Sequence, residues 1–588
     1  MKAEPATSNQ NSFSKKEKIA LYFGFALLWT YLIIRSHTVF LITDEIVTKW
    51  SYMIDWNPLP YMGYIDANNH FLNSFLGGLF YRIFHSDASW VIRLPNILAF
   101  PLFFWSAIRF APFFRQKVNF YGLLIVFSCS AFIIEYFALA RGYGLSIALF
   151  VSGIQFLLHY IQYQKKNAFY WCIISFLFAC YSNMSLVPLI LMAFVYLGLY
   201  LIHKKTFTQL TFLVVALVPI FYAIQYSFHL KEIGKLYYGG ENGFYQDTIH
   251  SLTQYFWNTG SIYLDIALTL VFLGIVYTAV VVFTQNKSIF NPAIILYSFC
   301  LAAVANILAQ HYILGVKFPE DRAAIYLPLL FFIALFFALD HWNKKWPALL
   351  LIAITIPHFV YDFNFEKSKF FYYEHFDEEL ISSIPESILG TPPTTGARFW
   401  KMDNERMRQA NINSYAFQNT YRDIDTLHDY IISTELIRPD LPLRYTVKYQ
   451  DPISKLTLFE RKKFLKRELI NTQVVLLDGD KEYFDFANAP LNGPMLFRIT
   501  GTLFDIDDVQ SFPIVVSTEN NSTRDVDTYD GLNFLESCTV NDKGEIHVDM
   551  SFAVGKNNTA DTFKSYIWNR NHLHISGQFK VEIYRLYN

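Results

Sequence analysis

Two adjacent carboxylates, Asp44 and Glu45, follow the first long apolar segment of the chain by a few residues. Ionisable side chains are rare so close to a membrane boundary, so a pair of them needs a reason. A carboxylate at the bilayer surface can act as a general base, taking the proton of a hydroxyl that attacks a lipid-borne substrate. We therefore predict Asp44 as the base and Glu45 as a neighbour that positions the acceptor. The alternatives are a helix N-cap for Asp44 and a solvated helix-surface charge for Glu45.

Three cations, Arg141, Lys317 and Arg322, lie in segments that we expect to face the same side of the membrane as Asp44. A guanidinium can donate two parallel hydrogen bonds to a phosphate, which suits arginine to binding a lipid-linked phosphate. Pairing inside the protein is the alternative. Arg141 can pair with Glu135, and Arg322 with the acidic residues that precede it.

Asp66 and His70 lie farther along the loop that carries Asp44, and either can orient a substrate or ligate a divalent cation. No complete metal-ligand spacing is present, and a histidine with satisfied hydrogen bonds at the membrane interface is the alternative for His70. A second loop, Lys231–Gln246, contains the segment Tyr237-Tyr238-Gly239-Gly240. An aromatic ring there can cover a sugar while the glycines allow movement, although a plain connecting loop has the same composition.

The composition indicates a membrane protein with a polar part. Of 588 residues, 53% are hydrophobic and 18% aromatic but only 16% are charged, against about a quarter in soluble domains. The net charge of -1 gives no broad basic surface, which argues against a nucleic-acid partner. The five cysteines form no CxxC pattern, and four lie in apolar segments, so no disulfide framework is indicated.

The apolar segments predict about eleven transmembrane helices in residues 19–361, after a cytoplasmic polar tail of residues 1–18. The uncharged stretch 167–202 is too long for one crossing and must contain two helices. The segment 71–84 is predicted to lie in the interface, as a helix with one apolar face within the first outer loop. With that assignment the Lys and Arg clusters fall on the cytoplasmic side, as the positive-inside rule requires.

The same count leaves the C-terminal part on the extracytoplasmic side. Residues 362–466 are predicted to form a mixed α/β segment, with a helical pattern at 423–437. Residues 467–588 contain short alternating runs separated by turn residues, which predicts a β-sandwich. Sandwiches often bind carbohydrate, but the fold alone does not decide between that role, a structural role and partner docking.

Five short motifs, in order over roughly the first 345 residues, resemble those of the GT-C superfamily of glycosyltransferases, in the branch of the protein O-mannosyltransferases and lipid A aminoarabinose transferases. The motifs are Asp44-Glu45, Asp66-Ala67-Asn68-Asn69-His70-Phe71-Leu72, Trp90-Val91-Ile92-Arg93-Leu94-Pro95, Ala140-Arg141-Gly142-Tyr143-Gly144-Leu145 and Asp321-Arg322-Ala323-Ala324-Ile325-Tyr326-Leu327-Pro328. The family's His-Pro-Pro-Leu segment retains only its histidine here, because Phe71 and Leu72 replace both prolines. That departure leaves the acceptor class open.

The resemblance implies an inverting transfer of a monosaccharide from a polyprenyl-phosphate donor lipid to an acceptor hydroxyl on a glycan, a glycolipid or a protein, on the extracytoplasmic side. It also implies roles in substrate or phosphate binding for Arg141, Tyr143 and Arg322. The phosphate leaves as a stable anion, so a cation that holds its charge matters more than a general acid. The sequence identifies no cofactor, and a divalent metal ion is one way to supply that cation. A transporter of lipid-linked sugars and a non-catalytic envelope scaffold are the rival functions.

Overall fold

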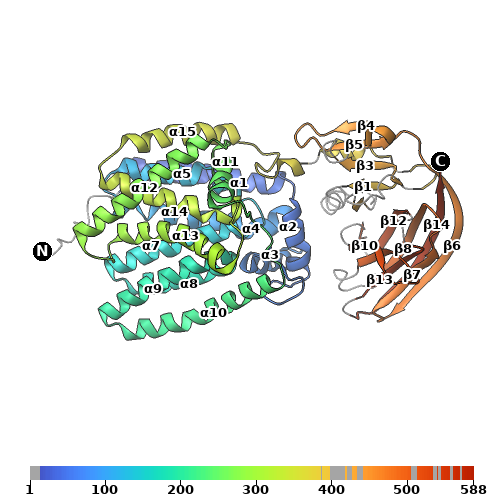
Figure 1. Ribbon diagram of the computed structural model, residues 1–588, viewed down its shortest axis with the longest axis horizontal. Helices are drawn as coiled ribbons and strands as arrows, with labels where there is room; N and C mark the ends of the chain where they lie inside the picture. Colours follow the sequence, from blue (N-terminus) through green and yellow to red (C-terminus); the bar gives the residue numbers. More distant parts are fainter. Residues whose placement is uncertain are drawn as a thin grey trace. The chain divides into compact units, whose positions relative to one another are not determined.

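The computed structural model divides the chain into two compact units (Figure 1). The first contains residues 1–39 and 47–370, and the second contains residues 40–46 and 371–588. The structure describes residues 13–375, 377–385, 387–391, 393–397, 417–419, 427–433, 441–504, 513–533, 539–540, 545–555, 560–569 and 572–588. Most of the predicted polar tail therefore lies outside the described residues.

The first unit, which we call the membrane unit, is helical, and its long helices run side by side in Figure 1. Its α-helices are α1 (Lys15–Thr38), α2 (Thr43–Thr48, which begins in the other unit), α3 (Phe71–Phe84), α4 (Ser89–Ile108), α5 (Lys117–Cys129), α6 (Ala131–Glu135), α7 (Tyr143–Tyr163), α8 (Lys166–Ser182), α9 (Val187–Lys204), α10 (Phe207–Glu232), α11 (His250–Trp257), α12 (Ile262–Asn286), α13 (Pro292–Leu314), α14 (Tyr326–His341) and α15 (Trp346–Asp362).

Among the described residues, seven helical segments are long and apolar enough to cross a membrane, and three shorter helices are also apolar. The stretch 167–202 contains two helices, α8 and α9, as its length predicts. Helices α10 and α12 leave most of their apolar side chains uncovered by protein, since only 22% of the most apolar window of each is buried. Such surfaces fit contact with lipid. The total of eleven spans stays a prediction.

Helix α3 has the bounds predicted for the interfacial helix, Phe71–Phe84. Its small residues Gly77 and Gly78 face inward, where a side-chain carbon would collide with Met53 and Trp56. Phe71 at its start is buried, whereas Phe75, Leu79, Ile83 and Phe84 remain exposed. The helix therefore packs closely through its glycines and leaves its apolar face for the bilayer, as an interfacial helix requires.

Two buried carboxylates cross-link elements of the membrane unit, each at a different end of it. Asp340, at the end of α14, accepts hydrogen bonds from the backbone N–H groups of Arg115 (2.9 Å) and Gln116 (2.8 Å), at the start of α5. Glu135, at the end of α6, forms an ion pair of 2.7 Å with Arg35 of α1. It also accepts a hydrogen bond of 2.6 Å from Ser368 beyond α15. These bonds satisfy helix-end groups that would otherwise be buried without partners.

The second unit begins with a five-stranded sheet in the order β2-β1-β3-β5-β4. Its elements are α16 (Glu378–Ser382), β1 (Thr395–Ala397), β2 (Phe417–Asn419), β3 (Tyr430–Ser433), α18 (Leu441–Arg444), β4 (Tyr445–Gln450) and β5 (Thr457–Arg461). Segment 40–46 is attached to this unit through the N–H of Thr43, which donates a hydrogen bond of 2.7 Å to Glu374.

The helix predicted at 423–437 is wrong where the structure describes it, because residues 430–433 form β3. Tyr430 and Ile432 enter one hydrophobic cluster, and Ile431 enters another. A strand buried on both faces has no polar alternation, so its apolar run resembles a helix in sequence. Residues 423–426 and 434–437 lie outside the described residues.

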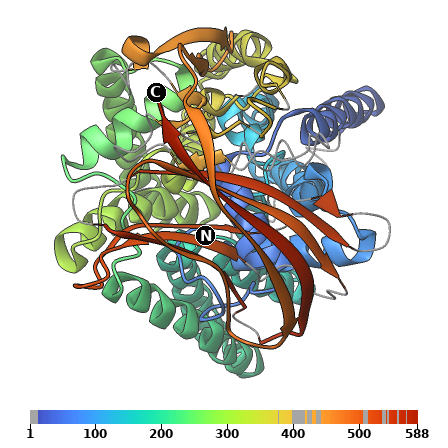
Figure 2. The ribbon, with the colours of Figure 1, turned by 90° about the vertical axis from the view of Figure 1, so that its right-hand side faces the viewer.

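The rest of the second unit is a β-sandwich, as predicted (Figures 1 and 2). A four-stranded sheet has the order β10-β9-β13-β7, and a five-stranded sheet has the order β11-β12-β8-β14-β6. The strands are β6 (Lys466–Gly479), β7 (Tyr483–Pro490), β8 (Met495–Phe504), β9 (Pro513–Glu519), β10 (Val526–Asn533), β11 (Thr539–Val540), β12 (Ile546–Val554), β13 (Thr562–Trp568) and β14 (Ile575–Tyr587).

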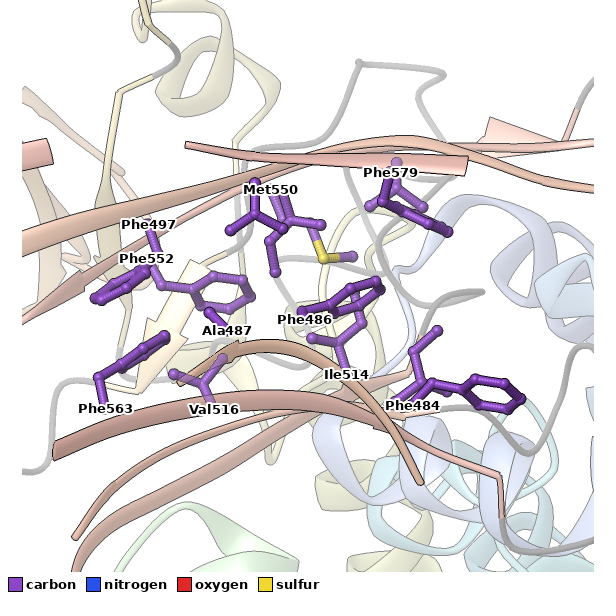
Figure 3. Close-up of a cluster of buried hydrophobic side chains, with 14 of the residues drawn as sticks. Phe484, Phe486, Ala487, Phe497, Ile514, Val516, Met550, Phe552, Phe563 and Phe579 are labelled. Atoms are coloured by element: carbon purple, nitrogen blue, oxygen red, sulfur yellow. The ribbon is translucent and has the colours of Figure 1, made fainter. Parts of the chain in front are cut away.

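Side chains from both sheets form one core (Figure 3). Phe497 of β8 stacks on Phe563 of β13 with ring centroids 3.4 Å apart, and Phe579 of β14 packs on Phe486 of β7 at 4.9 Å. Every second residue of these strands points into this layer, which is the alternation that predicted the sandwich.

Candidate active site

The loop between α6 and α7 carries Arg141 and is fixed in place by two asparagines. Asn73 of α3 donates a hydrogen bond of 3.1 Å to the carbonyl of Ala140 and accepts one of 2.7 Å from Asn96 of α4. The Asn96 side-chain oxygen in turn accepts the N–H of Leu145 at 2.9 Å. This chain of hydrogen bonds ties both sides of Arg141 to helices far away in the sequence.

Gly142 is required at this point for a steric reason. A side-chain carbon on it would lie 2.5 Å from the Cβ of His70 and 2.5 Å from the carbonyl oxygen of Ser182. The loop therefore approaches the start of α3 and the end of α8 so closely that only glycine fits there. The Ala-Arg-Gly-Tyr segment found in the sequence thus brings Gly142 and Tyr143 against His70.

Tyr143 is the common neighbour of the aromatic and charged side chains in this region. Its ring centroid lies 4.7 Å from that of His70 and 5.2 Å from that of Tyr136. The guanidinium carbon of Arg141 lies 5.8 Å from the Tyr143 ring centroid, within the range of a cation–π contact. Arg141 itself is only 2% exposed. A buried guanidinium among aromatic rings, in a loop between two helices, is suited to holding an anion.

Asp66 lies beside a lysine that the sequence analysis did not single out. Its carboxylate is 3.7 Å from the ammonium of Lys235 and within 3.5 Å of the Tyr64 hydroxyl. The ammonium also lies 5.1 Å from the Tyr64 ring centroid. The Tyr64 hydroxyl raises the pKa of Lys235, so this lysine remains charged. Asp66 therefore has a cation partner, and the described residues contain no group of three His, Cys, Asp or Glu side chains placed to hold a metal ion.

Tyr52 adds a buried hydroxyl close to Asp66 and Arg141. Its side chain is fully buried, and its ring centroid lies 6.4 Å from that of Tyr64. Burial, with the neighbouring Asp66 carboxylate, raises the pKa of Tyr52, and the charge of Arg141 also acts on the hydroxyl. Among the described residues, no group accepts or donates a hydrogen bond to this hydroxyl. It is therefore a protonated, buried donor within electrostatic reach of both charges.

Tyr52 lies on an unusual stretch of helix. Residues Lys49–Ile54 form a π-helix directly after α2, and Arg82 of α3 donates hydrogen bonds to the carbonyls of Met53 and Ile54. A π-helical turn shifts side chains away from the positions of a regular α-helix and occurs frequently at functional sites.

Asp321 and Arg322 form a second charged group on the loop before α14. The Tyr238 hydroxyl donates a hydrogen bond of 2.6 Å to Asp321, and Arg322 lies 3.4 Å from the same carboxylate. Burial and the Asp321 carboxylate raise the pKa of Tyr238, so it stays a hydrogen-bond donor. The charges of Asp321 and Arg322 act on the Tyr136 hydroxyl, beside Tyr143. This group therefore approaches the Arg141 region from another loop.

The loop that carries Tyr238 and the loop that carries Asp321 are joined by hydrogen bonds. The backbones of Gly240 and Phe318 exchange N–H···O bonds of 3.0 and 2.9 Å, and the side-chain hydroxyl of Thr248 donates a bond of 2.8 Å to the carbonyl of Pro319. A side-chain carbon on Gly240 would collide with the buried carboxylate of Asp247. The Tyr-Tyr-Gly-Gly segment is therefore held against the loop between α13 and α14.

The other predicted site residues of these loops are more exposed. Lys317 lies 3.3 Å from Glu241, in an ion pair at the surface. Tyr237 is 59% exposed, and its hydroxyl is within electrostatic reach of Lys235. Both lie at the edge of the region, and their roles in binding stay predictions.

The sequence left open whether Arg141 pairs with Glu135 and whether Arg322 pairs with the acidic residues before it. Glu135, which was open as a partner of Arg141, forms its ion pair with Arg35. Arg322 does lie beside Asp321.

His70 is buried, and its Nδ1 lies 2.7 Å from the carbonyl oxygen of Ser182. This contact satisfies one ring nitrogen and fixes the ring against Tyr143.

Asp44 and Glu45 lie in the first turn of α2, within segment 40–46 of the second unit. Glu45 is fully buried, and its carboxylate accepts the N–H of Ile42 at 3.1 Å, so the alternative of a solvated surface charge is wrong. Asp44 is half-buried. The Glu45 contact satisfies a backbone donor at the start of the helix, a capping role in which Asp44 was the residue expected.

Sequence reasoning missed Tyr52 and Lys235 as individual members of this region, and it named Tyr238 only as part of the aromatic loop. Each is a common residue in an aromatic or polar loop, with no spacing that marks it. Tyr238 adjoins Tyr237, so the aromatic loop pointed to the correct segment but to the more exposed ring.

No protein-family model and no curated protein matches the chain. Among solved structures, the chain is similar to ArnT from Cupriavidus metallidurans in the apo state, at a TM-score of 0.44 and 10% identity over 76% of this chain and 98% of that chain. The same protein bound to undecaprenyl phosphate matches at 0.44 and 9% over the same shares. Arabinosyltransferase EmbB from Mycobacterium smegmatis matches at 0.38 and 9%, over 99% of this chain and 66% of that chain.

The helical membrane unit followed by a β-rich C-terminal region agrees with the fold class predicted from the sequence. No residue role in this chain rests on matches of this identity and score.

Proposed function

We propose that the chain is an inverting glycosyltransferase that moves a monosaccharide from a polyprenyl-phosphate donor to an acceptor hydroxyl on the extracytoplasmic side of the membrane. One observation carries the proposal. Four outer loops, separated by tens to hundreds of residues, bring Arg141, Asp66 with Lys235, and Asp321 with Arg322 around Tyr143 and Tyr52. Mixed charge of this kind, buried at one end of apolar helices, suits a phosphate that remains attached to a lipid.

The chemistry assigns a role to each group. Arg141 and the Tyr52 hydroxyl donate hydrogen bonds to the donor phosphate and hold its charge as it leaves. Asp44 takes the proton of the acceptor hydroxyl as its oxygen attacks the anomeric carbon from the face opposite the phosphate. The sugar–phosphate bond breaks with both electrons going to phosphate, which needs no protonation to leave. Tyr143 and Tyr237 present rings to the sugar.

The proposal is tested by transfer from a radiolabelled glycosyl undecaprenyl phosphate to envelope extract, with the purified protein in nanodiscs. Asp44→Asn is expected to lower the rate by about 100-fold or more, the scale of a lost general base. It should still bind undecaprenyl phosphate, measured by native mass spectrometry. The matched control is Asp478→Asn, at an 85% exposed position in the C-terminal unit, which should leave the rate unchanged.

Three outcomes would contradict the proposal or its parts. An Asp44→Asn protein with the full transfer rate removes the proposed base. Movement of labelled carrier across vesicles, by protein that never transfers sugar, favours a transporter. A stable complex with envelope proteins and no bound carrier lipid favours a scaffold.

A further inference from the structure

The outer face of the four-stranded sheet of the sandwich carries an aromatic row. In β13 the core residues Phe563 and Ile567 alternate with Lys564, Tyr566 and Trp568, so the last three point away from the core. Strand β7 brings Tyr483 opposite Trp568, and Asp485 opposite Tyr566. On the far side of β9, Tyr529 of β10 lies opposite Ser517, which pairs with Lys564.

The four aromatic rings of this row lie close to one another. Tyr483 and Trp568 are nearly parallel, with an interplanar angle of 15° and centroids 6.3 Å apart. Tyr483 and Tyr566 are 5.6 Å apart and nearly perpendicular. The Tyr566 and Tyr529 side chains are hydrogen-bonded to each other. Tyr483 is 48% exposed and Tyr529 45% exposed, so the row opens to solvent at both ends.

Polar side chains accompany these rings. Asp485 and Asn488 of β7 are exposed on the same face, and Lys564 pairs with Glu519 at 2.5 Å across the neighbouring strand. Flat aromatic faces pack well against the C–H groups of a pyranose ring, while carboxylates and amides bond its hydroxyls. We propose that this aromatic row is a binding site for a chain of pyranose sugars.

The side chains on the face favour a glycan over a protein partner. Among the described side chains of these four strands, the exposed large apolar residues are two tyrosines and Val526. Protein interfaces bury a core in which apolar side chains exclude water. Exposed aliphatic side chains of that kind occur instead on β6 of the other sheet, at Val474 and Leu476. The glycan site lies wholly within the second unit and does not depend on the transfer reaction.

The test is calorimetry on the full-length protein in detergent with four soluble hexasaccharides: cellohexaose, maltohexaose, mannohexaose and chitohexaose. At least one should bind. Trp568→Ala and Tyr483→Ala should each weaken that binding about tenfold, as expected for loss of one aromatic contact at the centre of a site. The control Leu476→Ala changes an exposed residue of the other sheet and should bind with unchanged affinity.

Further variants test whether the alanine variants are folded and whether a second copy of the chain, instead of a glycan, occupies this face. Tyr483→Phe keeps the ring and should retain most of the affinity, and equal melting temperatures show that the alanine variants are folded. The proposal is overturned if none of the four sugars binds, or if binding survives both alanine substitutions. A change of oligomeric state caused by Tyr529→Ala, measured by light scattering without sugar, would assign the face to a second copy and also overturn it.

Discussion

At the scale of single residues, removing the Tyr52 hydroxyl should affect the stability of the protein and its binding of the donor lipid differently. In Tyr52→Phe no hydrogen bond among the described residues is lost, and a buried polar group is removed, so the melting temperature should stay equal or rise. If the hydroxyl donates to the donor phosphate, undecaprenyl phosphate should bind about 10- to 100-fold more weakly, the range for a hydrogen bond to a charged group. Native mass spectrometry measures the binding, and unchanged binding would remove Tyr52 from the site.

The same residue illustrates what a sequence can tell about a site. Arg141 and Tyr143 were recognisable because they stand in a short motif, and the close approach at Gly142 explains why the motif needs its glycine. Tyr52 and Lys235 stand in no motif. Their importance comes only from loops that converge in three dimensions, and no pattern within one segment records that convergence.

At the scale of elements, Asp340 and Asn73 each cross-link parts of the membrane unit, at opposite ends of it, so variants of the two can be compared. Asp340→Ala removes the acceptor of two backbone N–H groups and should lower the free energy of unfolding by about 2–4 kcal/mol. Asn73→Ala removes the bond to Ala140 and should also destabilise the protein. Only Asn73→Ala should reduce sugar transfer, by about tenfold, because it releases the loop of Arg141.

This comparison is made at a temperature where thermal scans show both variants folded. Equal loss of transfer in both would mean that stability alone governs activity. The isosteric Asp340→Asn keeps one acceptor oxygen and should fall between Asp340→Ala and the unchanged protein in melting temperature.

Among the elements, the single apolar face predicted α3 with its correct bounds, and length divided 167–202 into two helices. Apolar periodicity also predicted strands at β8 and β12, where one face is buried. It was wrong at β3, because burial on both faces removes the alternation that identifies a strand.

At the scale of the whole molecule, the prediction concerns orientation in the membrane. Glu17 at the start of α1 pairs with Lys117 at the start of α5, so these two helix ends lie on the same side. The positive-inside rule predicts that this side is cytoplasmic and that the turn after β9 is extracytoplasmic. In a variant lacking all five cysteines, Ser522→Cys should react with a membrane-impermeant maleimide in intact cells. Lys287→Cys should react only after the cells are opened, and the reverse result would invert the topology.

The ion pair of Arg35 and Glu135 has a consequence for how the protein is made. Arg35 donates hydrogen bonds to the carbonyls of Asn364 and Lys367, and Glu135 accepts one from Ser368. Helix α1 thus obtains its last partners from a segment synthesised more than 300 residues later. Until then, an arginine and a glutamate near the membrane surface have only part of their hydrogen bonds, and leaving buried charges incompletely paired costs several kcal/mol. A nascent chain stopped short of residue 364 is therefore a natural substrate for proteolytic quality control.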